Sequence, residues 1–285
     1  MPNQAAMRIG FTKMSGAGND FVLIDNLSGE LSVDWKDIAQ PVCRRRLGIG
    51  ADGLLVLERG SAEPFIMRYY NADGSSGGMC GNGGRCAARY YMDLTGSNDV
   101  SFEAVGRRYS ARRAGSLVTL MMGNPGDLRA NLRIDQGSGV VRAHFIDTGA
   151  PHAVIFQDEQ TPPLSLGNIP ADEFRQFGRS IRSHPAFQPG GANVDIVQLN
   201  PDGSLSMRTY ERGVEEETLA CGTGAVACAL AASVLRGVDS PVTILTRSNE
   251  RLTVRFTRNR QSFDAVELEG SARITYTGFF DYPFL

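Results

Sequence analysis

The chain has 285 residues, enough for two ordinary domains with a sizeable core, and its net charge of −2 argues against a nucleic acid or a membrane surface as its main partner. The first ten residues lack the charged-then-apolar order of a signal peptide, and the longest apolar run, Ala225–Leu235, is too short to span a membrane. Five cysteines, an odd number without dense spacing, favour a reducing cytoplasm over a disulfide framework.

The first part of the chain predicts short strands around two helices. Strands are expected over residues 21–24, 54–57, 65–70, 101–105, 109–113 and 117–121. A helix is expected over residues 34–46, where Pro41 should kink or split it. A second, Ala-rich helix follows Cys80 and should end just before Gly96. It carries one polar stripe, made of Arg85, Arg89 and Asp93.

The second part repeats this alternation. Strands are expected over residues 140–146, 153–156, 194–199, 205–210, 242–246, 252–256, 265–268 and 273–277. A surface helix is expected over residues 170–182, with Phe174, Phe177 and Ile181 on its inner face. The helix after Cys221 is apolar all round until Arg236, which predicts burial on every side.

These elements predict an α+β protein of two similar units, each a mostly antiparallel sheet with one buried helix. The glycine- and proline-containing segment 123–127 is the best candidate for a hinge between the units.

One short motif occurs twice in the chain. Cys80-Gly81-Asn82-Gly83 and Cys221-Gly222-Thr223-Gly224 share the order Cys-Gly-polar-Gly, and each precedes an Ala-rich helix. Unpaired N–H groups and the helix dipole favour a thiolate at a helix N-terminus, so each position should lower the pKa of its cysteine. Two matching thiols suggest two equivalent catalytic groups for one substrate. Packing would explain a single copy, and it is the better interpretation for Cys86 and Cys228, which lie inside the helices.

Three other kinds of site compete with this interpretation. A zinc site is disfavoured because the cysteine pairs are too widely spaced and only three histidines exist. A cysteine hydrolase gives no reason for a second matching thiol. A nucleotide-binding loop is the serious competitor, because the segment from Gly222 to Ala227 opens a helix; the similar pattern at 48–53 precedes a strand instead.

Polar side chains suited to a small amino-acid-like ligand stand at the predicted strand ends. They are Asn19, Asn71, Asn193, Glu211, Arg212 and His152. Each one alone is more often a turn former or part of a solvated pair than a ligand contact.

The repeated motif and several neighbours together resemble the diaminopimelate epimerase family. The resemblance also rests on Gly18-Asn19-Asp20-Phe21, on the segment 71–75, on Pro151-His152 and on the segment 210–213. It extends in order from about Met14 to the C-terminus. The family's broader relatives include proline racemases, hydroxyproline epimerases and phenazine-pathway isomerases.

The resemblance implies two pseudo-symmetric halves, each a curled sheet around a central helix, with the last strand returning to the first half. It places the first domain at residues 1–127 plus 273–285 and the second at residues 128–272. It implies interconversion of LL- and meso-diaminopimelate in the lysine and cell-wall pathway, with no metal or other cofactor. A small-molecule substrate and a homodimer are its implied partners.

The resemblance also implies roles for single residues. Cys80 and Cys221 would be the acid and base, and His152 and Glu211 would tune their pKa values. The N–H groups around Gly81, Asn82, Gly222 and Thr223 would stabilise the carbanion through its carboxylate. Asn19, Asn71, Asn193, Glu211 and Arg212 would hold the substrate, with Arg212 on the distal carboxylate.

Two positions depart from the family pattern. Gly53 stands where some members have Gln, and Ala150 where many have Asn, so two substrate contacts are weak or lost. A racemase of another amino acid therefore remains an alternative, beside the nucleotide-binding module. The acidic run 215–217 is longer than the family's short link and is expected to be a solvated loop.

Overall fold

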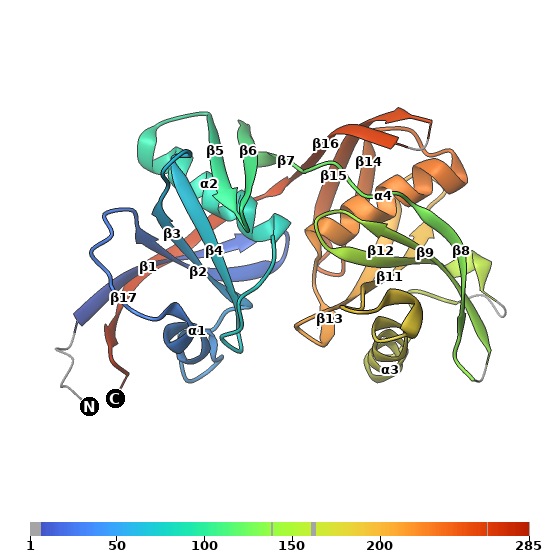
Figure 1. Cartoon of the computed structure of the whole chain (residues 1–285), viewed down its shortest axis with the longest axis horizontal. Helices are drawn as coiled ribbons and strands as arrows, with labels where there is room; N and C mark the ends of the chain where they lie inside the picture. The colour runs from blue at the N-terminus through green and yellow to red at the C-terminus, as the bar shows by residue number, and fades with distance from the viewer. Residues whose placement is uncertain (1–6, 138, 161–163, 261, 285) are drawn as a thin grey trace. The chain divides into compact units, whose positions relative to one another are not determined.

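The computed structural model describes residues 7–137, 139–160, 164–260 and 262–284 (Figure 1). The chain divides into two compact units, one of residues 1–118 and 271–285 and the other of residues 119–270. The chain therefore enters the second unit after residue 118 and returns to the first unit at residue 271, earlier than the predicted boundaries at residues 127 and 273. The expected hinge at 123–127 lies within the second unit, because its flanking backbone is held there: Met122 donates to the Val266 carbonyl at 2.8 Å and Gly126 to that of Asp147 at 2.7 Å.

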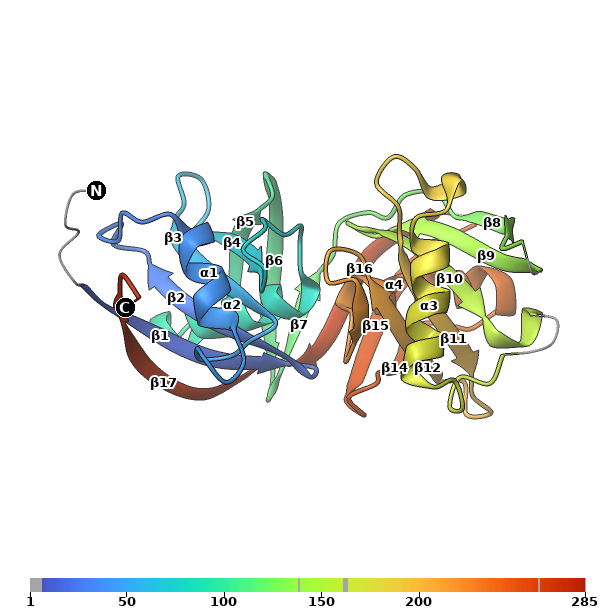
Figure 2. The same ribbon diagram turned by 90° about the horizontal axis from the view of Figure 1, so that it is seen from below.

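The first unit is a sheet with a helix between each parallel pair of strands (Figures 1 and 2). Its strands are β1 (Met7–Gly16), β2 (Asn19–Asn26), β3 (Gly53–Arg59), β4 (Phe65–Asn71), β5 (Asp99–Ala104), β6 (Arg107–Ala114) and β17 (Arg273–Tyr282). From β1 to β6 the successive pairings are antiparallel, parallel, antiparallel, parallel and antiparallel, and β17 pairs antiparallel with β1. Helix α1 (Trp35–Cys43) links β2 to β3, and α2 (Gly81–Thr95) links β4 to β5.

The second unit repeats this plan. Its strands are β8 (Arg129–Asp135), β9 (Val140–Asp147), β10 (Pro151–Phe156), β11 (Asn193–Leu199), β12 (Leu205–Glu211), β13 (Glu216–Thr218), β14 (Val242–Leu245), β15 (Arg251–Asn259) and β16 (Ser262–Ser271), and β7 (Leu117–Met121) carries the chain into it. The order β9, β10, β11, β12, β14, β15 shows the same five alternating pairings as β1 to β6. Helix α3 (Ala171–Arg182) links β10 to β11, and α4 (Gly222–Arg236) follows β13 and leads to β14.

The repeated pairing order confirms the predicted α+β class with two similar, mostly antiparallel units. In sequence, only the Cys-Gly motif shows the repeat. In structure, α2 follows β4, whereas α4 follows the equivalent strand β12 and the short β13, and each helix ends at a left-handed glycine, Gly96 or Gly237.

The two central helices differ in how they are buried. Helix α4 is buried from Gly222 to Ser233, as its uninterrupted apolar sequence predicts. In α2, the predicted polar stripe does not lie on one exposed face. Arg89 and Asp93 form an ion pair at 2.7 Å near the surface, whereas Arg85 has no exposed area. A fully buried guanidinium requires specific partners, which lie at the helix N-terminus described below.

Several element boundaries differ from the prediction. Helix α1 contains Pro41 in its last turn and ends at Cys43, so residues 44–46 are not helical and the helix is shortened rather than split. A proline lacks the backbone N–H that would donate to a carbonyl of the preceding turn, and the chain leaves the helix soon after it. Strands β1, β8 and β13 were not predicted. Strand β1 forms a hairpin with the next strand, β2, and also pairs with β17, which is distant in sequence.

Glu215 lies in an exposed turn, but the rest of the acidic run 215–217 does not form a loop, which corrects that part of the prediction. Residues Glu216–Thr218 form β13, which pairs with the end of β12. Glu217 accepts two hydrogen bonds from Arg208, at 2.7 and 2.8 Å, with only 15% and 6% of the two side chains exposed. The carboxylate is drawn inward because the buried guanidinium needs a counter-charge.

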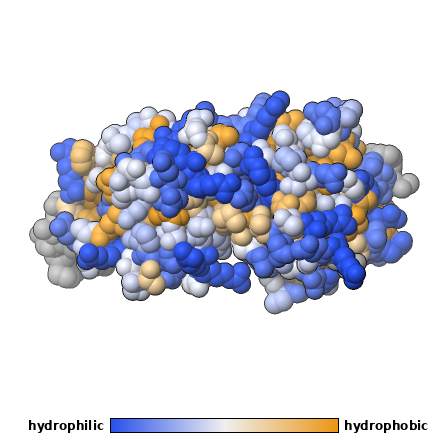
Figure 3. All heavy atoms as spheres, turned by 90° about the horizontal axis from the view of Figure 1, so that it is seen from above, coloured by the Kyte–Doolittle hydropathy of each residue, from blue (hydrophilic) through white to orange (hydrophobic). Residues whose placement is uncertain are grey.

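Within the described residues, no helix is long and apolar enough to cross a membrane. On the face drawn in Figure 3, hydrophilic residues are interspersed with smaller hydrophobic areas.

Candidate active site

The two motif cysteines occupy the same position on their helices. Cys80 is the N-cap of α2 and Cys221 is the N-cap of α4, both with extended backbone. The carbonyl of each accepts the first helical hydrogen bond, at 2.7 Å from Gly84 and at 2.9 Å from Ala225. Two short thiol side chains therefore lie beside the positive ends of equivalent helices.

The side chains of these N-caps are held differently. The sulfur of Cys80 accepts a hydrogen bond from the Gly83 N–H at 3.3 Å and is half-buried. The sulfur of Cys221 lies 3.5 Å from the Thr223 hydroxyl and is buried. The remaining thiols, Cys43, Cys86 and Cys228, are also buried, and burial raises the pKa of Cys86 to about 12.

In the first unit, the predicted ligand-binding residues lie at one edge of the sheet. Asn19 begins β2, Gly53 begins β3 and Asn71 ends β4, and the register aligns Gly53 with both Phe21 and Asn71. Asn19 is joined to the helix, because its Oδ1 accepts from Asn82 Nδ2 at 2.6 Å. The side chain of Asn71 instead donates to Ser75 at 2.9 Å within the following turn.

Gly53 has no room for a side chain. A Cβ at this position would lie 2.4 Å from the ring of Tyr69 and 2.7 Å from the Tyr70 carbonyl. Tyr69 comes from the neighbouring strand β4 and also packs edge-on against Phe21 at 6.2 Å. The ring of Tyr69 thus fills the space at the start of β3 that a side chain at position 53 would occupy.

The second unit gathers its predicted residues at the equivalent edge. His152 in β10 is aligned with Asn193, which begins β11, and Glu211 ends the adjacent strand β12. Asn193 accepts from the Arg212 backbone N–H at 2.8 Å and donates to the Pro151 carbonyl at 3.1 Å. Ala150 lies in the turn before β10, where its carbonyl accepts from Thr148 at 3.0 Å. The Arg212 guanidinium contacts the Gly190 carbonyl at 3.4 Å.

A buried chain of polar groups connects His152 to Cys221. Asp195 Oδ2 lies 2.7 Å from His152 Nδ1, and His152 Nε2 lies 2.9 Å from the Thr223 hydroxyl. Thr209 donates to the other oxygen of Asp195 at 2.7 Å. Because a carboxylate only accepts, a neutral His152 carries its hydrogen on Nδ1 and presents Nε2 as an acceptor to Thr223. This order leaves the Thr223 oxygen able to accept from the Cys221 thiol.

Gly224 makes this arrangement possible. A Cβ at Gly224 would lie 2.6 Å from Asp195 Oδ1, so any larger residue would displace the carboxylate that orients His152. Asp195 was not predicted as a site residue. The available signal was an acidic residue within the apolar strand segment Val194-Asp195-Ile196, where an unpartnered carboxylate would be costly.

The expected lowering of the pKa does not occur at Cys221. Burial raises the pKa of its thiol well above the ordinary value, and the nearby carboxylates of Glu211 and Asp195 raise it further. The contacts that the Thr223 hydroxyl and the Gly224 backbone make with this thiol lower its pKa but do not outweigh burial. Cys221 is therefore a thiol at neutral pH, the form that a proton donor needs.

The described residues contain no group of three or more His, Cys, Asp and Glu side chains placed to hold a metal ion. The segment 48–53 leads into strand β3, so within the described chain it does not form the helix start that a dinucleotide loop requires. The Gly222 loop does open a helix, but the carboxylate of Asp195 lies directly under it, and a negative charge there disfavours a phosphate group.

Comparison with known proteins gives a consistent result. The sequence model described as diaminopimelate epimerase matches residues 11–126 and 144–274. The chain is 41% identical over 271 residues to a diaminopimelate epimerase of Chlorobaculum tepidum, covering 93% of this chain and 98% of that protein. It is 36% identical over 283 residues to one of Hydrogenobaculum sp., covering 95% and 98%.

The fold is also similar to that of solved structures. A hydroxyproline epimerase of Agrobacterium vitis, solved with bound trans-4-hydroxy-L-proline, superposes with a TM-score of 0.75 at 14% identity, covering 97% of this chain and 93% of that one. At this identity the likeness concerns the fold alone.

Proposed function

The chain belongs to the diaminopimelate epimerase family, and we propose that it is an isomerase that interconverts LL- and meso-diaminopimelate by proton transfer at the α-carbon. The observation that carries this proposal is the equivalent placement of Cys80 and Cys221 at the N-caps of the two central helices. Inversion of a stereocentre requires a base on one face and an acid on the other, and two equivalent thiols can exchange these roles with the direction of reaction.

In this mechanism Cys80 and Cys221 both act on one α-carbon, one as thiolate and the other as thiol. The raised pKa of Cys221 suits it to the thiol role in the free enzyme. The path through Thr223 and His152 gives its proton a route of hydrogen-bonded groups when the roles reverse. The backbone N–H groups that follow the two cysteines stabilise charge that develops on the α-carboxylate. No metal or other cofactor takes part in this chemistry.

The substrate contacts are proposed for Asn19, Asn71, Asn193, Glu211 and Arg212, with the Arg212 guanidinium on the distal carboxylate. His152 and Glu211 set the proton affinity of the thiols. Glu211 is one of the carboxylates that raise the pKa of Cys221. We place the protein in the cytoplasm, in the lysine and peptidoglycan precursor pathway, and expect a homodimer that binds neither nucleic acid nor a membrane.

Incubation of the protein with LL-diaminopimelate in D₂O tests the proposal. Deuterium at the α-carbon together with meso product is the expected result. Cys80→Ala and Cys221→Ala should each lower the rate by about 10²- to 10⁴-fold, the usual cost of losing a general acid or base. Turnover near that of the unmodified protein in either variant would remove that cysteine from the mechanism.

A racemase of another amino acid is the second candidate. The Tyr69 ring beside Gly53 and the small side chain at Ala150 favour it, because both positions lack a polar side chain that could hold a dicarboxylate substrate. Exchange of deuterium into other amino acids, without exchange into diaminopimelate, would support this candidate.

A further inference from the structure

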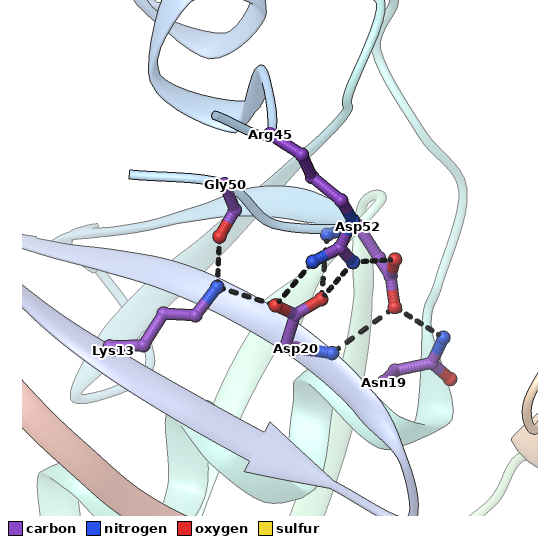
Figure 4. Close-up of polar contacts among 6 residues, drawn as sticks. All are labelled: Lys13, Asn19, Asp20, Arg45, Gly50 and Asp52. Atoms are coloured by element: carbon purple, nitrogen blue, oxygen red, sulfur yellow. Dashed lines mark hydrogen bonds and ion pairs between the residues drawn. The ribbon is translucent and has the colours of Figure 1, made fainter. Parts of the chain in front are cut away.

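A cluster of charged side chains lies beside the start of β2 in the first unit (Figure 4). Asp20 accepts from Lys13 Nζ at 2.7 Å and from Arg45 at 2.7 Å, and Lys13 also donates to the Gly50 carbonyl. Arg45 donates to Asp52 Oδ1 at 2.8 Å as well. Burial opposes ionisation of Asp20, but the hydrogen bonds from Arg45 and Lys13 prevail and lower its pKa. Two cations thus balance two carboxylates at this edge of the sheet.

One carboxylate of the cluster continues into a chain of amides. Asp52 Oδ2 accepts from Asn19 Nδ2 at 3.0 Å and from the Asp20 backbone N–H at 3.2 Å. Asn19 Oδ1 accepts from Asn82 Nδ2 at 2.6 Å. Asn82 Oδ1 accepts from the buried Arg85 at 2.8 Å, and Arg85 also donates to the Gly81 carbonyl at 3.3 Å. The chain therefore runs from Asp52 to the first turn of α2.

The two ends of this chain fix the direction of every amide in it. An ionised carboxylate can only accept hydrogen bonds, and a guanidinium can only donate them. Turning over the Asn19 amide would place its oxygen against Asp52 and its NH₂ against the NH₂ of Asn82. Both contacts would pair like with like, so Asn19 must face Asp52 with its nitrogen.

This orientation decides what Asn19 presents to a ligand. One hydrogen of Nδ2 is used by Asp52, and among the described residues the second hydrogen has no protein partner. Asn19 is 8% exposed, so a ligand at this strand edge would meet an N–H donor there. A donor of this kind suits a carboxylate, and it would repel the ammonium group of an amino acid.

We propose that Asp52 is a positioning residue that, through its hydrogen bond to Asn19, sets the amide so that it donates to a substrate carboxylate. Arg85 secures the same orientation from the other end of the chain. This inference rests on the proposed function, since it assigns the substrate group that Asn19 receives. The second unit shows a parallel arrangement, in which Asp195 orients His152 and the next link is Thr223, at the same helix position as Asn82.

Asp52→Asn tests the proposal. The new amide has a single acceptor oxygen. If that oxygen accepts from Asn19, the NH₂ of the new amide must face the Arg45 guanidinium, and two hydrogen-bond donors then lie against each other. We expect kcat/KM for diaminopimelate to fall by about 10- to 100-fold, the range of a hydrogen bond to a charged group, with the larger part as a rise in KM. Asp20→Asn is the matched control, because it makes the same change in the same cluster without touching Asn19. Asp20→Asn should lower the thermal midpoint of unfolding at least as much as Asp52→Asn does, while changing kcat/KM by less than about 3-fold.

A double-mutant cycle separates positioning from general weakening of the fold. If Asp52 acts through Asn19, then Asp52→Asn in the background of Asn19→Ala should change kcat/KM by less than about 2-fold, because the group it positions is already gone. Additive losses in the cycle, or a loss in Asp20→Asn as large as that in Asp52→Asn, would overturn the inference. The unmodified protein tests the proposed function separately. If it shows no exchange of the α-proton, the proposed function is rejected. If it shows exchange but the losses in the double-mutant cycle are additive, only the role of Asp52 is rejected.

Should Asp52→Asn fail to fold, the exchange variant Asp52→Asn with Asn19→Asp provides the second measurement. It restores a donor–acceptor pair between the two positions but offers the ligand an oxygen in place of an N–H. We expect recovery of folding without recovery of kcat/KM. Recovery of both would overturn the inference.

Discussion

At the level of single residues, the two cysteines have the same helix position but different surroundings. Cys80 is half-buried and accepts a backbone N–H, whereas Cys221 is buried near the carboxylates of Glu211 and Asp195. A helix N-terminus favours the thiolate, but at Cys221 desolvation and two negative charges outweigh it. The state of a thiol at such a position is therefore set by its neighbours as much as by the helix.

The raised pKa predicts how Cys221 reacts with alkylating reagents. Because the thiolate is the nucleophile, alkylation by iodoacetamide should be slow at pH 7 and should accelerate as the pH rises toward the pKa of Cys221. Glu211→Gln removes one of the charges that raise this pKa, so its alkylation profile should move to lower pH. Mass spectrometry of the Cys221 peptide across a pH series measures this, and a profile that does not move in the variant would remove Glu211 as a cause.

At the level of elements, the third residue of each central helix is a glycine with a different neighbour. A Cβ at Gly83 would lie 3.0 Å from a methyl group of Leu55, whereas a Cβ at Gly224 would lie 2.6 Å from Asp195 Oδ1. The leucine side chain can rotate away. The Asp195 carboxylate is held by His152 and Thr209 and cannot yield without breaking the chain to Cys221.

Alanine at these two positions should therefore have unequal effects. Gly224→Ala is expected to destabilise the protein by about 1–3 kcal/mol through overpacking and to lower kcat by at least about 10-fold. Gly83→Ala, its counterpart on the other helix, should cause a smaller loss of stability and a smaller decrease in kcat. Chemical denaturation and steady-state kinetics of the two variants provide the comparison, and equal losses would contradict the role given to Asp195.

The short strand β13 carries a second prediction at this scale. Glu217 neutralises the buried Arg208, so Glu217→Ala should lower the free energy of unfolding by about 3 kcal/mol because it leaves a buried charge unpaired. Glu216 pairs with Arg175 at 2.6 Å, but both side chains are about half exposed. Glu216→Ala is the matched control and should cost less than about 1 kcal/mol. Urea denaturation distinguishes the two.

At the level of the whole molecule, the repeat explains why the chain has two matching thiols. Six strands in each unit pair in the same alternating order, and in both units the central helix comes after the fourth of these strands. A duplicated plan yields two N-cap positions, and each carries a cysteine with the same flanking glycines. The second unit supplements its thiol with His152, whereas the first unit has Asn19 in the corresponding chain.

If both thiols reach one carbon atom of the substrate, they must also be able to reach each other. We therefore expect mild oxidation to join Cys80 to Cys221 by a disulfide and to abolish activity, with recovery on addition of a thiol reductant. Peptide mapping under non-reducing conditions identifies the bond. Cys86→Ala is a suitable control because that buried thiol should not affect the cross-link. Full activity after oxidation, without the bond, would count against a shared substrate.

Much of the fold followed from local patterns. Most strands and both central helices were placed correctly because apolar runs bounded by glycines carry their own signal. Strand β1 and the fate of the acidic run 215–217 could not be predicted, since their partners are distant in sequence or across a turn. The first is stabilised by pairing with β17, and the second by the buried Arg208.

The sequence by itself determined which residues could perform the chemistry: two thiols with the same flanking glycines, each at a helix start, because capping and turn formation are local properties. Only the tertiary structure decided how those residues are tuned. Asp195 and Asp52 lie in or beside strands that pack against the central helices, and neither stands in the repeated Cys-Gly motif. The proton affinity of Cys221 and the direction of the Asn19 amide depend on burial and on charges brought close by folding, and such contacts between distant segments leave no periodic trace in the chain.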